Sequence, residues 1–317
     1  MPLPFTYTEL LEACPPMLHA SHGTMGVIDP HHIVVVGCSD YRDGSYRGFA
    51  IMDTSTSEAT MYNGALGWRA AEYAGHPYDG RYWVLTTTND FESSGITVHA
   101  IEADGGVYIW DTGIWTNLTV GGNYPGVVIL DDWFVLRMSG GTMKGWSMAT
   151  PTLGSVVLST STRPTDTSTG TQVTLAIWNA MSCAKRAGQI YGWCYNNNTL
   201  YSVDRTAWTV TPLAVSSYAV AVIAEPEIYV AGKYWSHGTW FDLGTMTGGS
   251  VASGGVGDHA LASDGYIYSV TSSSTIRCLD PVSGVQNSQT IPSRSERYGV
   301  AFLDGHLWVP SGYPYSW

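Results

Sequence analysis

A polar turn followed by a strand rich in aromatic and β-branched residues recurs along this chain of 317 residues. Seven copies occur, at residues 29–34, 79–83, 131–135, 187–191, 225–229, 264–268 and 304–308. From Val34 in the first copy to Trp308 in the last, six intervals span 274 residues, or about 46 residues each. A steady period of this length indicates a repeat architecture, in which each copy is one small structural unit.

The residues within each copy predict a small antiparallel sheet. Asp-Gly and Glu-Pro pairs favour tight turns, because Gly reaches positive φ and Pro presets φ. The strand after the turn is enriched in Val, Ile, Tyr and Trp. A third strand often ends in Asp, as at Asp53, Asp204, Asp242 and Asp280, and a more polar fourth strand follows, as at residues 285–291.

This repeat resembles that of β-propeller proteins, whose four-stranded blades recur roughly every 40 to 50 residues. The resemblance covers nearly the whole chain and implies an all-β fold: a seven-bladed β-propeller of four-stranded blades, forming one domain over residues 1–317. The last copy stops inside its third strand. We therefore expect residues 1–22 to supply a closing strand, with residues 5–13 pairing against residues 313–317 of the last blade. The WD, kelch and sialidase signatures are missing, so the resemblance is to the architecture and to no particular family.

Charge is scarce and negative. Charged residues make up 13% of the chain, against roughly 25% in typical globular proteins, and the net charge is −12. Nucleic-acid binding is disfavoured, because phosphate contacts need clustered Lys and Arg. No apolar run approaches the length of a membrane span, so we expect no membrane insertion. The N-terminus also lacks the features of a secretory signal.

No motif in the sequence has the spacing of a metal site, a nucleotide loop or a catalytic nucleophile. We therefore predict no metal, no cofactor and no catalytic residue. The five cysteines have no paired spacing and are expected to be buried free thiols, with a pair between Cys183 and Cys194 as the alternative.

The loops between second and third strands are the candidate binding surface, because these loops share one face of a propeller. Residues 39–47, 89–94, 195–198 and 233–237 carry aromatic side chains beside amides and charges. This mixture is typical of recognition surfaces and of sugar stacking. The alternative is that these aromatics seal the blade ends. The predicted binding residues are Tyr41, Arg42, Tyr46, Phe91, Tyr234 and Trp235.

The longest connector, residues 159–182, is rich in Ser and Thr. Long connectors inside compact domains are often functional or flexible. We interpret it as an insertion that either contacts a neighbouring subunit or remains disordered.

Low charge, richness in Gly, Ser and Thr, and the lack of a catalytic motif favour a non-enzymatic binding or structural module. The composition is similar to that of phage tail and fibre proteins. That similarity implies a virion location, with an extracellular or cytoplasmic location as alternatives. The implied partners are other virion structural proteins or a host-surface glycan or protein. The alternative function is a glycan-active enzyme, a glycosidase or lyase, but its candidate carboxylates Glu72, Glu92 and Asp258 are scattered along the chain.

Overall fold

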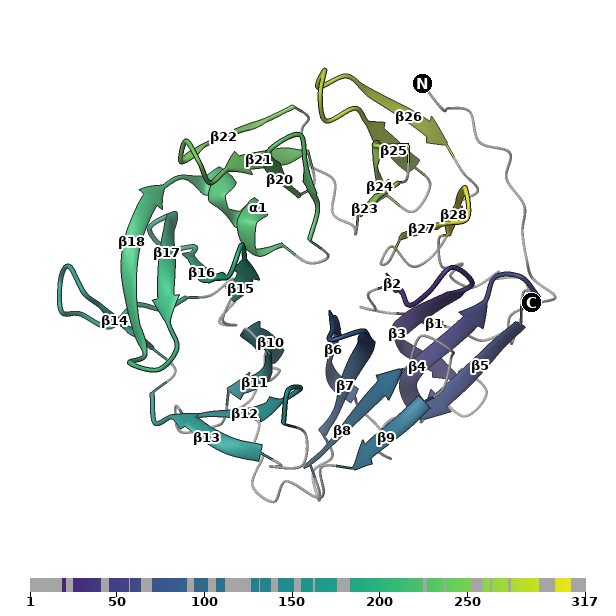
Figure 1. Cartoon of the computed structure of the whole chain (residues 1–317), viewed down its shortest axis with the longest axis horizontal. Coiled ribbons are helices and arrows are strands. Elements are labelled where there is room, and N and C mark those ends of the chain that lie inside the picture. Colours follow the sequence, from purple (N-terminus) through teal and green to yellow (C-terminus); the bar gives the residue numbers. More distant parts are fainter. Residues whose placement is uncertain are drawn as a thin grey trace. The chain divides into compact units, whose positions relative to one another are not determined.

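In a computed structural model the secondary structure of the described residues is almost entirely β-strand (Figure 1). The structure describes residues 19–20, 25–40, 46–56, 58–63, 70–89, 94–101, 107–111, 127–130, 132–137, 142–150, 155–161, 163–175, 183–224, 227–236, 238–251, 259–262, 264–272, 275–290 and 300–308. Contacts divide the chain into two compact units, residues 1–114 with 251–317, and residues 115–250. The prediction of one domain over residues 1–317 stays a prediction.

The first unit holds four antiparallel sheets. Its first sheet contains β1 (His19–Ala20), β2 (Met25–Val27), β3 (His32–Asp40), β4 (Tyr46–Asp53) and β5 (Glu58–Asn63). The second contains β6 (Ala70–Tyr78), β7 (Arg81–Asn89), β8 (Ser94–Ile101) and β9 (Val107–Asp111). The third contains β23 (His259–Leu261), β24 (Ile267–Ser272), β25 (Thr275–Leu279) and β26 (Gln286–Thr290). The fourth contains β27 (Ala301–Leu303) and β28 (His306–Trp308).

The second unit holds three sheets and the one helical segment of the described residues. The first sheet contains β10 (Val127–Leu130), β11 (Trp133–Arg137), β12 (Met143–Ser147) and β13 (Ser155–Ser159). The next contains β14 (Thr165–Asp166), β15 (Cys183–Arg186), β16 (Gln189–Cys194), β17 (Thr199–Asp204) and β18 (Thr209–Val215). After it come the 3-10 turn η2 (Ser217–Ala219) and the helix α1 (Val220–Ile223). The last sheet contains β19 (Tyr229–Val230), β20 (Lys233–Ser236), β21 (Thr239–Asp242) and β22 (Thr247–Ser250).

Two-residue turns of positive φ join the first and second strands of four sheets. Both turn residues have φ between 48° and 80°, at residues 79–80, 187–188, 231–232 and 304–305, and Gly stands second in each. Such turns match the right-handed twist of a hairpin, and Gly adopts them without steric cost. The turns expected from the sequence at residues 79–80, 187–188 and 304–305 are thus confirmed.

The fifth predicted copy was wrong in register. The sequence placed its turn at Glu225-Pro226 with Ile228 and Tyr229 in the second strand. In the structure Tyr229 belongs to the first strand, and Ala231-Gly232 makes the turn. The residues before β19 form η2 and α1, and the apolar side chains of these two elements fill the core beside β15 and β16. A Glu-Pro pair therefore looked like a hairpin turn because of its local composition alone.

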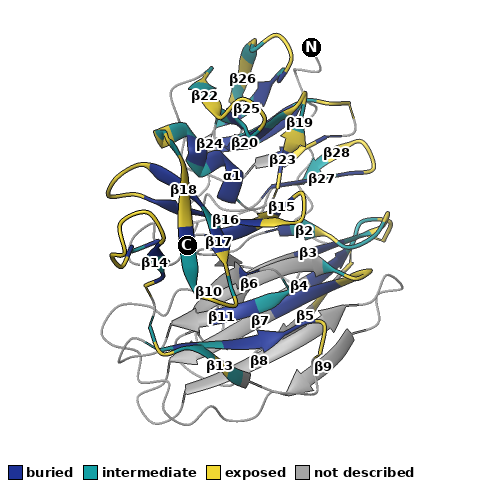
Figure 2. Cartoon of the chain, turned by 60° about the vertical axis from the view of Figure 1, so that its left-hand side comes forward, coloured by how far each residue is buried: buried dark blue, intermediate teal, exposed yellow. Residues whose placement is uncertain are grey.

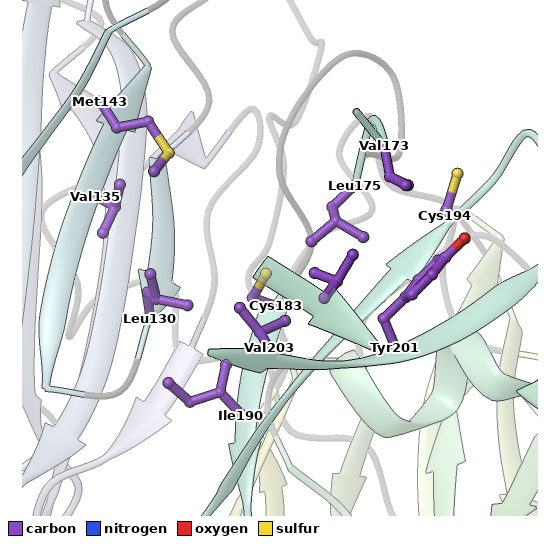
Figure 3. Packing of buried hydrophobic residues seen from close by; sticks show 11 residues of the cluster. Leu130, Val135, Met143, Val173, Leu175, Cys183, Ile190, Cys194, Tyr201 and Val203 are labelled. Carbon is purple, nitrogen blue, oxygen red and sulfur yellow. The ribbon is translucent and has the colours of Figure 1, made fainter. Parts of the chain in front are cut away.

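Within the second unit, consecutive sheets pack face to face, and alternate residues of one strand enter different cores. Ile190 and Cys194 of β16 join a core with the β10–β13 sheet, as Figure 3 shows. Trp193, between them in the chain, joins a core with α1 and the β19–β22 sheet. In the first unit, Tyr268 of the β23–β26 sheet packs with Val300 and Phe302 near β27. The inner strand β16 is therefore largely buried, whereas the fourth strand β18 is mostly exposed (Figure 2).

The described part of the predicted insertion is built into the second unit. Residues 165–166 form β14, which pairs in parallel with Thr209 and Val210 of β18. Val173 and Leu175 are buried in the core shared with the β10–β13 sheet. A freely disordered insertion is therefore excluded for residues 163–175, because their backbone and apolar side chains are fixed against a sheet.

Antiparallel four-stranded meanders that follow one another and pack face to face are the blades of a β-propeller. The predicted all-β propeller fold is confirmed, with a helix content of one short segment in the described residues. Seven complete four-stranded blades are not present there: six sheets have four or five strands, and the β27–β28 sheet has two. In the first unit β27 contacts β2, so the last sheet adjoins the first. The predicted closing strand, residues 5–13 with 313–317, lies outside the described residues.

Candidate functional site

Two of the predicted binding residues are buried, which corrects their expected place on a loop. Tyr234 and Trp235 lie inside β20 and are 6% and 2% exposed. The ring of Tyr234 lies 4.7 Å from that of Tyr229, and the indole Nε1 of Trp235 donates to the carbonyl of Val230 at 3.2 Å. Because the turn of this blade falls at residues 231–232, the two aromatics belong to the strand core. They seal the blade, as the alternative interpretation held.

The other four predicted residues are not brought together by what the structure describes. Tyr46 opens β4, with its backbone paired to Asp40 of β3. Tyr41, Arg42 and Phe91 lie outside the described residues. The binding surface predicted around them stays a prediction.

The turn between β16 and β17 carries an exposed aromatic residue that the sequence analysis did not single out. Tyr195 is 65% exposed, and its ring meets Trp193 edge-on, with centroids 6.1 Å apart. Asn196, Asn197 and Asn198 follow it and are also exposed. Residues 195–198 were predicted as a recognition loop, so the location of the loop is confirmed. Tyr195 could have been identified as a candidate from the sequence, because it lies outside the alternating pattern of β16.

Hydrogen bonds hold this turn in one conformation. The side chain of Asn197 donates to the hydroxyl of Tyr201 at 2.9 Å and accepts from the backbone N–H of Thr199 at 3.2 Å. The carbonyl of Asn198 accepts from the N–H of Ser216 at 2.7 Å, which ties the turn to the end of β18. Val215, the cross-strand partner of Thr199, is 78% exposed beside it. We name residues 195–198 with Val215 the blade tip.

Aspartates at the ends of third strands have a structural role. The Oδ1 atoms of Asp53, Asp204, Asp242 and Asp280 each accept hydrogen bonds from backbone N–H groups two and three residues later. These bonds fix the turn to the fourth strand. The pKa of Asp53 falls to about 2, first because the hydroxyl of Ser55 donates to it. Hydrogen bonds from a Ser or Thr hydroxyl likewise lower the pKa of Asp242 and Asp280. The turn hydrogen bonds therefore favour the ionised form of Asp53, Asp242 and Asp280.

Three cysteines have described side chains, and all are buried and free: Cys183, Cys194 and Cys278. The alternative of a disulfide between Cys183 and Cys194 is wrong, because Cys183 lies opposite Gly192 in the sheet. Burial raises the pKa of the Cys183 thiol to about 12, so it behaves as an apolar side chain.

The described residues contain no group of three or more His, Cys, Asp or Glu side chains arranged to hold a metal ion. Among the helices that are described, none is long and apolar enough to cross a membrane.

The arrangement of sheets defines the class, a β-propeller. No protein-family model matches the chain, and no curated protein sequence matches it. Similar solved structures include the WD40 β-propeller domain of Doa1, at 13% identity over 93% of this chain and 92% of that chain, with a TM-score of 0.48. The computationally designed Ika8 protein is similar at 14% identity over 92% of this chain and 93% of that one, with a TM-score of 0.47.

A third similar structure is the extracellular domain of a hybrid two-component system, BT3049, from B. thetaiotaomicron. It shares 12% identity over 90% of this chain and 37% of that chain, with a TM-score of 0.47. At such low identities and TM-scores the fold assignment rests on the sheets of this chain themselves.

Proposed function

We propose that this chain is a non-enzymatic binding and structural module of a virion, of the minor tail or fibre type. It contacts a partner subunit or a host-surface receptor through the blade tip. The observation that carries the proposal is the exposed ring of Tyr195 on a turn fixed by hydrogen bonds. A large side chain on a stiff turn supplies contact area while little conformational freedom is lost on binding.

Charge and the use of carboxylates support the same proposal. The chain has 13% charged residues, so a contact made through Tyr195 and Val215 desolvates few charges. Hydrogen bonds of their turns lower the pKa of Asp53, Asp242 and Asp280, whereas the acid of a glycosidase needs a raised pKa. Glu72, Glu92 and Asp258, which the enzyme alternative named, have no described side chains.

The experiment compares Tyr195→Ala and Val215→Ser with the wild type in binding to purified virions and to host-cell envelopes. We expect each change to weaken binding several-fold while the melting temperature stays unchanged. Val282→Ser is the matched control, since Val282 is 82% exposed in a turn of the first unit. Unchanged binding by both tip variants would remove the tip from the proposal. Turnover of a polysaccharide that one carboxylate substitution abolishes would replace the proposal with the enzyme.

The ring itself is proposed to have seven blades. The β27–β28 sheet would be the inner half of the seventh, and the strand supplied by residues 5–13 would complete it. The contact between β27 and β2 within the first unit supports this closure. Deletion of residues 1–13 should then expose a sheet edge and cause aggregation or a large fall in melting temperature. A deletion variant that stays soluble and melts like the wild type would exclude the closing strand.

A further inference from the structure

A polar hollow of about 420 Å³ lies at the other end of the sheet that carries the blade tip. Its walls come from the start of β16, the end of β17, the turn at residues 205–208 and the start of β18. The side chains that matter for its chemistry are Gln189, Ser202, Asp204, Arg205, Thr206 and Thr209. A volume in this range is that of small-molecule sites in proteins, which run from roughly 300 to 1,000 Å³.

Some polar groups of this hollow have no partner among the described residues, whereas the side-chain amide of Gln189 donates to the backbone carbonyl of Ile190 at 2.9 Å. Within the described part of the chain, the hydroxyls of Ser202, Thr206 and Thr209 make no hydrogen bond to another residue. The guanidinium of Arg205 makes one described contact, a cation–π contact with Trp133 at 5.3 Å from the ring centre. Its N–H donors are therefore available to a ligand, while the indole holds the group in place.

The hollow is preorganised by its surroundings. Asp204 accepts from the backbone N–H groups of Thr206 and Ala207, which fixes the turn that carries Arg205. Thr211, at the outer wall, exchanges a hydrogen bond of 2.9 Å with Thr167. Thr167 directly follows β14, so the strand that pairs with β18 also braces the hollow. A rigid wall lowers the ordering cost of binding.

We propose that this hollow binds a neutral, hydroxyl-rich ligand, namely one sugar unit of an uncharged saccharide. Its lining residues carry hydroxyl, amide, guanidinium and carboxylate groups, so the hollow contains both donors and acceptors. Each sugar hydroxyl both donates and accepts, and adjacent hydroxyls match such a lining. One Asp and one Arg balance in formal charge, which suits an uncharged ligand better than an acidic one.

This site is separate from the proposed contact through the blade tip. Gln189 stands at the first residue of β16, and Tyr195 directly follows its last residue, Cys194. At about 3.3 Å per residue, the two ends of the strand lie on the order of 17 Å apart. A change at one end should leave binding at the other end intact, so the two proposals can fail independently.

The test probes the wild type with an array of neutral, uronic-acid and sialylated oligosaccharides, followed by calorimetric titration of the neutral one retained best. We expect Arg205→Gln, and the double variant Ser202→Ala with Thr206→Val, each to weaken binding at least tenfold. Thr245→Val changes the equivalent turn of the β19–β22 sheet and should bind as the wild type does. Tyr195→Ala should also bind normally.

Retention of no saccharide, or unchanged affinity in both hollow variants, would overturn the proposal. Retention of acidic sugars alone would overturn the assignment of an uncharged ligand. Loss of saccharide binding in Tyr195→Ala would move the site away from the hollow. Circular dichroism and the melting temperature of each variant establish that a loss of binding is not a loss of fold.

Discussion

Arg186, at the end of β15, reaches Glu227, just before β19, with 3.1 Å between its guanidinium and the carboxylate. The guanidinium is buried and also donates to the carbonyls of Val222 and Ala224, both at 2.8 Å. One side chain therefore ties the end of α1 and the β19–β22 sheet to the β14–β18 sheet.

Replacing Arg186 by Met should lower the free energy of unfolding by about 2–4 kcal/mol, because the carbonyls of Val222 and Ala224 lose their donors. Glu227 is 43% exposed, so Glu227→Gln should cost less than about 1 kcal/mol. Chemical denaturation of both variants measures the difference. Equal losses would mean that the ion pair, rather than the carbonyl contacts, fastens the sheets together.

Stability should fall as the pH is lowered below about 5. The pKa of Asp53 in the folded protein is about 2, below its ordinary 3.8, and those of Asp166, Asp242 and Asp280 are also lowered. The unfolded chain therefore binds more protons in acid, and the stability present above the ordinary pKa is lost as the pH falls through the folded one. Melting temperatures between pH 7 and pH 2.5 follow this loss.

Asp53→Asn is the matched variant, because an amide oxygen can still accept from the turn but has no charge to lose. Its melting temperature should depend less on pH than that of the wild type. An identical slope in both proteins would show that Asp53 makes no contribution to acid unfolding.

Gly192 and Leu175 should be coupled in stability. A Cβ at Gly192 would lie 2.8 Å from the Cδ1 of Leu175 and 3.1 Å from the Cγ2 of Val203. Gly192→Ala should therefore cost about 1–3 kcal/mol by overpacking, and Leu175→Ala about 2–5 kcal/mol by leaving a cavity.

In the double variant the shortened side chain at position 175 makes room for the methyl group added at position 192. The combined loss should therefore fall short of the sum by on the order of 1 kcal/mol. Leu279→Ala, in the first unit, is the control and should combine additively with Gly192→Ala. Additive losses for the Leu175 pair would contradict the docking of residues 173–175 on this sheet.

Trp208→Phe should lower the free energy of unfolding far less than the replacement of a packed aromatic residue usually does. In the described part of the chain, the indole Nε1 of Trp208 is buried and has no hydrogen-bond partner. An unpaired buried donor costs about 1–3 kcal/mol, and its removal should offset the lost packing. We expect a change within about 1 kcal/mol in urea denaturation. A loss above about 3 kcal/mol would indicate that the donor is satisfied in solution, for example by bound water.

Local sequence determined the turns and the strand boundaries beside them. The pairs at residues 79–80, 187–188 and 304–305 were identified from composition. Gly adopts positive φ because it has no Cβ, and this preference does not depend on tertiary contacts. The aspartates that end third strands could be found for the same reason, since the bonds of Asp204 reach only two and three residues along the chain. Propeller architecture followed from the period at which these local signals repeat.

Tertiary structure decided which side chains are buried and what the connectors do. Tyr234 and Trp235 have the composition of a binding loop, yet both are buried, and Tyr234 fills a core that β20 shares with α1 and the β14–β18 sheet. Residues 165–166 become a strand only where β18 offers an unpaired edge. The polar hollow combines residues from three strands and a turn, and no spacing along the chain marks it. Turn formation depends on the φ preferences of adjacent residues, whereas burial depends on surfaces that distant segments provide, and the hollow depends on how neighbouring strands pair.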